Sequence, residues 1–151
     1  FTRHGVLNEI EIQARHEIML ENYIMKVQIE ARVMGDLALN HIIPTAIIYQ
    51  NKLIQNANGL KGLGINADDI IETIEELSKH VSIIKKLTNE MVGERKKVNK
   101  MEDSRARAIA YCDQVKAKYF DQIRYSVDKL ELLVDDEDWP LVKYRELLFL
   151  R

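Results

Sequence analysis

The spacing of side chains in the first third of the chain constrains the fold more than any other feature of the sequence. Positions recur at alternating steps of three and four residues through Leu20, Ile24, Val27, Ala31, Met34, Ala38, His41, Thr45 and Ile48. Such steps place successive side chains on one face of an α-helix, where they form a seam that packs against other helices. The pattern predicts a long first helix over about residues 7–56, followed by a glycine-rich loop over 58–66.

Two further apolar stripes predict long second and third helices, over about residues 68–101 and 104–134. The third stripe consists of Ile109, Cys112, Val115, Tyr119, Ile123, Val127, Leu130 and Val134. Proline is tolerated in the first turn of a helix, where its missing N–H costs nothing. Pro140 therefore fits the start of a short fourth helix over about residues 140–149.

Short connections between these helices make sequential neighbours antiparallel. We therefore expect an all-α fold, an up-down-up antiparallel three-helix bundle with long helices plus a short C-terminal helix, in a single domain over residues 1–151. The chain has only six Gly and two Pro, which is too few for a β fold with many turns. Because the first helix is longer than its neighbours, the segment before about Glu21 should project beyond the bundle.

Charge and composition limit the classes of partner. The 22 basic and 24 acidic side chains leave a net charge of −2, which argues against a dedicated nucleic-acid binder. No apolar stretch is long enough for a membrane span. A lone cysteine, Cys112, cannot form an internal disulfide and fits a reducing cytoplasm. The chain begins at Phe1 instead of Met, which suggests a piece of a longer protein.

A proline inside the predicted first helix marks a candidate site. Pro44 removes the hydrogen bond to the Asn40 carbonyl, and Asn40, His41 and Thr45 cluster around the break. One interpretation is a polar pocket or hinge. The other is a tolerated kink whose freed carbonyl finds a side chain or water. The sequence leaves both open.

Searches for catalytic or cofactor chemistry find little. No histidine has Glu three residues before it, as a di-metal bundle requires. The glycines over 59–64 lack the Gly-Lys-Ser/Thr of a phosphate-binding loop. Cys112 lies on an apolar stripe, which favours a small core residue over a nucleophile. We therefore expect no catalytic, cofactor-binding or metal-binding residue in this chain.

Three blocks of the sequence resemble a known family. The stretches Gly5–Glu17, Ile29–Gln50 and Ile123–Phe149 are similar to the C-terminal helical region of type III glutamine synthetases. The resemblance implies a large cytoplasmic, homo-oligomeric parent enzyme of nitrogen assimilation and glutamine biosynthesis. It would join ammonia to glutamate with ATP and a divalent metal, expected to be magnesium. The catalytic domains would lie upstream and outside this chain, so the fragment alone would bind no cofactor and would not be an enzyme.

The resemblance thus implies a non-catalytic C-terminal domain that serves subunit packing, assembly or regulation. Its partners would be the upstream catalytic domains of the same polypeptide and neighbouring subunits. Candidate docking residues against the catalytic body are Trp139, Pro140, Tyr144, Leu147 and Leu148. One alternative is a free-standing helical-bundle interaction module, without enzymatic activity, that uses the seam of the first helix. Another is a small-ligand or metal-binding bundle that uses the Asn40–Thr45 break.

Overall fold

The computed structural model describes residues 5–149, and it has helices but no strand in this range. The first long rod consists of α1 (Glu9–Leu37), the π-helical segment η2 (Ala38–Ile42) and α2 (Ile43–Gly62). Asn8 caps its start, because its side-chain oxygen accepts the Glu11 N–H at 2.8 Å and the Glu11 carboxylate accepts the Asn8 N–H at 2.8 Å. The all-α class expected from the sequence is confirmed.

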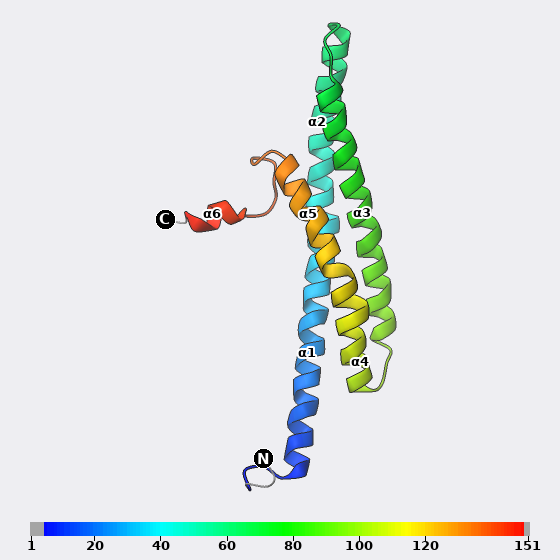
Figure 1. The fold of residues 1–151 in the computed structure, drawn as a ribbon, viewed down its shortest axis with the longest axis vertical. Helices are drawn as coiled ribbons and strands as arrows, with labels where there is room; N and C mark the ends of the chain where they lie inside the picture. The colour runs from blue at the N-terminus through cyan, green and yellow to red at the C-terminus, as the bar shows by residue number, and fades with distance from the viewer. Residues whose placement is uncertain (1–4, 150–151) are drawn as a thin grey trace.

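The other two long helices pack along this rod. Helix α3 (Asp68–Val98) returns beside it, and the third rod rises again as α4 (Ser104–Ala110), η3 (Tyr111–Phe120) and α5 (Asp121–Leu133) (Figure 1). Helix α3 contacts both α2 and α5, while α1 contacts α4. The amino-terminal turns of α1 extend past the α3–α4 connection, and the α2–α3 hairpin extends past the end of α5 (Figure 1).

The π-helical segment η2 absorbs the proline and changes the face of the rod that is buried. The Ile43 N–H donates to the Ala38 carbonyl, five residues earlier, so the turn before Pro44 holds one residue more than an α-helical turn. The predicted seam is correct through Ala38, which is buried, but His41 and Ile48 are exposed. The residues that continue the buried face are Ile42, Ile43 and Ala46.

Because of a second π-helical segment, η3, the buried face of the third helix differs from the predicted one. Ile109 is 55% exposed and Cys112 is also exposed, so the expectation that Cys112 belongs to the core was wrong. The wider turns of η3 keep a four-residue spacing on the buried side. That side carries Tyr111, Val115, Tyr119 and Ile123, all at most 2% exposed.

The ends of the helices differ from the predictions in two places. The first rod continues to Gly62 instead of ending near residue 56, and within the predicted loop over 58–66 only Gly64 has a positive φ, +75°. Its neighbour Ile65 donates to the Leu60 carbonyl at 2.9 Å, as in a Schellman C-cap. The fourth helix, α6 (Tyr144–Leu148), is shorter than the predicted 140–149. Lys143 has an extended backbone (φ −74°, ψ 151°), so the helix begins after it.

Candidate docking site

The residues at the helix break lie on the solvent side of the first rod. Asn40, His41 and Pro44 are exposed, and Thr45 is half-buried. The Asn40 amide donates to the Asp36 carboxylate at 2.6 Å, one turn earlier on the same helix. The interior side of this turn carries Ala38 and Ile42, which are apolar. The four predicted residues therefore share a surface turn, with apolar side chains between them and the bundle interior.

The predicted C-terminal docking residues separate into an inner and an outer group. Trp139 is 8% exposed and belongs to the domain's own core, whereas Pro140 is exposed. Leu147 and Leu148 are 54% and 62% exposed, and Phe149 after them is 76% exposed. The side chain of Tyr144 lies outside the described residues. We call residues 144–149 the C-terminal arm, and it extends away from the bundle (Figure 1).

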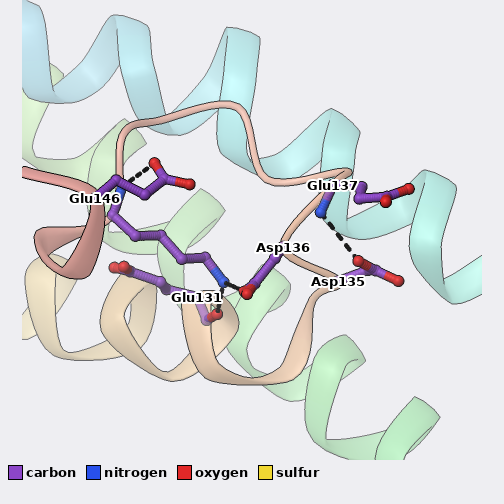
Figure 2. A network of polar contacts seen from close by, with 6 residues as sticks. Glu131, Asp135, Asp136, Glu137 and Glu146 are labelled. Carbon is purple, nitrogen blue, oxygen red and sulfur yellow. Dashed lines mark hydrogen bonds and ion pairs between the residues drawn. The ribbon is translucent and has the colours of Figure 1, made fainter. Parts of the chain in front are cut away.

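Lys143 holds the base of this arm. Its amine is almost buried, with 12% of the side chain exposed, and donates to the Glu131 carbonyl at 3.0 Å and to the Asp136 carboxylate (Figure 2). The same amine lies 5.9 Å from the centre of the Trp139 ring, a cation–π distance. The Glu146 carboxylate accepts the Lys143 backbone N–H at 3.1 Å and caps α6. Lys143 was not among the predicted site residues, although a cation shortly after the acidic run 135–138 is the signal that could have indicated it.

The acidic run before Trp139 is itself attached to the first rod. Asp138 accepts a hydrogen bond from the Lys52 amine at 2.5 Å, and this contact raises the pKa of Lys52. The Trp139 N–H donates to the Asp135 carbonyl at 3.0 Å, which closes the turn. These bonds fix residues 135–143 on the side of the bundle and set the position from which the arm leaves.

An apolar groove lies between the first and third rods, beside the base of the arm. Its volume is about 410 Å³. The apolar lining consists of Val33, Met34, Leu37, Ala38, Ile42, Phe120, Ile123, Val127 and Leu141. Glu30 and Arg124 also line it and supply its charged groups. The groove is a place where two predicted apolar stripes meet without covering each other completely.

A more polar hollow of about 520 Å³ lies between α3 and α5, around His80. The imidazole is buried, its Nε2 is 3.9 Å from the Glu76 carboxylate, and its Nδ1 has no hydrogen-bond partner among the described residues. Burial lowers the pKa of His80 below its usual value, with a smaller opposing effect from Glu76. Glu76 and His80 are four residues apart, a spacing that by itself predicts an ordinary surface pair. The structure buries the histidine because the buried face of α3 includes position 80.

Within residues 5–149, no cluster of three or more His, Cys, Asp or Glu side chains has a geometry suited to a metal ion. No helix in this range has the length and apolar character needed to cross a membrane. The seam of α1 is also not available to another helix, because Ile24, Val27 and Ala31 are already buried inside the bundle. Among the described residues, the groove and the arm lie next to each other and both expose apolar side chains.

Comparison with known proteins finds relatives of this helical domain. A family model described as the glutamine synthetase C-terminal domain matches residues 1–61. A glutamine synthetase from Bacteroides fragilis is 46% identical over 95% of the chain, and a type-3 glutamine synthetase from Dictyostelium discoideum is 25% identical over all of it. The chain is therefore similar to glutamine synthetases, and its residues 1–61 are similar to their C-terminal domain. It spans about a fifth of the length of these relatives, 20% and 21%.

The family match covers one side of the docking surface. The matched residues 1–61 form nearly the whole first rod, including Val33, Leu37 and Ile42 of the groove. The opposite wall and the arm come from residues after the match, and the Dictyostelium relative aligns with the whole chain. The groove is therefore built from both parts of the chain.

Proposed function

We propose that this chain is the non-catalytic C-terminal domain of a type III glutamine synthetase and that it serves the packing of subunits in that enzyme. The supporting observation is an arm with Leu147, Leu148 and Phe149 exposed, next to an open apolar groove. Adjacent apolar surfaces that a domain leaves uncovered are typical of interaction sites. The similarity to glutamine synthetases supports such an enzyme as the parent protein.

The parent enzyme would ligate ammonia to glutamate with ATP hydrolysis, in the cytoplasm and as a homo-oligomer. ATP and magnesium would bind to upstream catalytic domains of the same polypeptide, which lie outside residues 1–151. The chain is a small share of its relatives' length, which supports placing that chemistry elsewhere. ADP release by the full-length enzyme should require both glutamate and ammonia, and the 151-residue chain should show none.

Removal of the arm tests the packing role. The truncation should remove residues 144–151 only, because a cut before Trp139 would also remove a core side chain. In the full-length enzyme, we expect this truncation to shift the assembly to smaller species on dilution, as measured by light scattering after size exclusion. Leu132→Ser is the matched control, since Leu132 is 80% exposed on α5 and does not line the groove. An unchanged mass over the same dilution series would contradict the packing role.

A further inference from the structure

The groove and the arm have matching chemistry, and this match identifies a partner. We propose that the C-terminal arm of one subunit inserts Leu147 and Leu148 into the apolar groove of a second copy of this domain. The inference rests on the proposed packing function and names the surface and the partner through which it operates. A two-fold arrangement would let each copy give an arm and receive one, so that the contact is self-complementary.

The groove has the size and lining to accept leucine side chains. Its volume of about 410 Å³ has room for roughly two or three such side chains at protein packing density. The lining is aliphatic and aromatic, and Leu141 from the C-terminal segment already lies against it. Covering these surfaces with leucine removes apolar area from water on both sides, which is favourable by about 25 cal/mol per Å².

The groove also offers a charged partner for the arm. Arg124 lines it and, among the described residues, forms a long, exposed ion pair with Asp128, at 3.8 Å. Glu146 is an exposed carboxylate in the turn that carries Leu147. With the leucines in the groove, Glu146 of one copy and Arg124 of the other form an ion pair of opposite charge at the rim.

The anchor at Lys143 argues against insertion of the arm into the groove of its own copy. The nearly buried amine is bound to the Glu131 carbonyl and to Asp136, and α6 leaves the bundle from that point (Figures 1 and 2). Leu147 lies only four residues after this anchor, and one turn of α6 occupies that distance. A return to the groove at Leu141 would require the loss of these bonds or of the helix. The groove of a second copy could bind the extended arm while the Lys143 hydrogen bonds and the α6 helix are both kept.

Photo-crosslinking in the full-length enzyme tests the partner directly. One preparation carries benzoylphenylalanine at position 148, and it is co-assembled with a ¹⁵N-labelled enzyme that lacks the photoreactive residue. We expect crosslinked peptides that join position 148 of the unlabelled copy to residues 33–42 or 120–127 of the labelled copy. Crosslinks to the groove within unlabelled copies alone, to the catalytic part of either copy, or to nothing would overturn the proposal.

Two substitutions on α1 supply a matched pair for this experiment. Val33→Glu puts a carboxylate at the groove, whereas Ile29→Glu makes the same change one turn earlier, outside it. Both positions are about half exposed, 51% and 55%, so both variants should fold. We expect the crosslink between copies to fall about tenfold or more in Val33→Glu, because an unpaired charge is costly in an apolar contact, and to persist in Ile29→Glu. Equal yields in the two variants would overturn the proposal.

The crosslink and the truncation fail in different ways. If removal of residues 144–151 dissociates the assembly but position 148 reacts only with the catalytic part, the packing function stands and the exchange between copies is wrong. If position 148 reacts with the groove of the other copy but truncation leaves the assembly mass unchanged, the exchange stands and the packing function is wrong.

Discussion

The three-rod body and the C-terminal arm both carry large apolar side chains, yet these side chains have different surroundings in the two regions. In the body, Leu77, Ile84 and Met91 are completely buried between rods. In the arm, Leu147 and Leu148 are more than half exposed. The difference lies in the neighbours, because a helix of five residues cannot cover its own apolar side. An apolar residue in the sequence therefore becomes buried inside the domain only where a second element packs against it.

The same substitution in the two regions gives the largest expected contrast. Leu77→Ala should lower the free energy of unfolding by about 2–5 kcal/mol, because it opens a cavity in a fully packed site. Leu148→Ala should change it by less than about 0.5 kcal/mol, since the side chain is exposed in the single domain. Urea unfolding of the 151-residue chain, followed by circular dichroism, measures both. Similar losses in the two variants would remove the distinction between body and arm.

The junction between the regions should show an intermediate effect. Lys143→Met keeps much of the length of the side chain but leaves the Glu131 carbonyl and the Asp136 carboxylate without this donor. We expect a loss of about 1–3 kcal/mol in unfolding free energy, the usual cost when a partly buried polar contact loses one partner. We also expect faster proteolysis between residues 134 and 143, where the chain is no longer held.

Lys86→Met is the matched control for the junction, since Lys86 is exposed on α3 and should tolerate the change. If Lys143→Met is as stable and as protease-resistant as Lys86→Met, the arm does not depend on the anchor. The contacts of Lys143 would then not be what directs the arm away from the groove of its own copy.

Much of the body follows from the sequence, because steps of three and four residues between apolar side chains are a direct consequence of helix geometry. The observed second and third helices, Asp68–Val98 and Ser104–Leu133, end within three residues of the predicted 68–101 and 104–134. What the spacing does not contain is the extra residue of a π turn. Pro44 indicated a disturbance of the helix at this point. The set of residues that face inward after the break, however, depends on the path of the whole helix.

The docking surface was less predictable. Trp139, Leu147 and Leu148 were grouped as one apolar cluster, but the structure buries the first and exposes the other two. Their separation depends on Lys143, whose partners are a backbone carbonyl twelve residues earlier and a carboxylate seven residues earlier. The groove likewise requires a partial gap between two rods far apart in sequence. Contacts of this kind arise from the tertiary arrangement and leave no periodic pattern.

The smallest effect we expect is a pH dependence of folding stability caused by His80. It tests whether the interior of the body excludes water from this imidazole. Its pKa is lowered chiefly by burial, against the attraction of Glu76 and with the help of repulsion from Lys79 and Lys129. The unfolded chain therefore binds a proton at a higher pH than the folded chain does, and folding stability decreases as the pH falls through the usual histidine range, near 6.5.

Between pH 7.5 and 5.5, the urea midpoint should fall more for the unchanged chain than for His80→Gln. His16→Gln, at an exposed position on α1, should keep the full decrease. If His80→Gln loses stability with acidification as steeply as His16→Gln, water reaches the imidazole. His80 is the one histidine that the bundle buries among the described residues. At this position, the body would then not differ from the arm in its exposure to water.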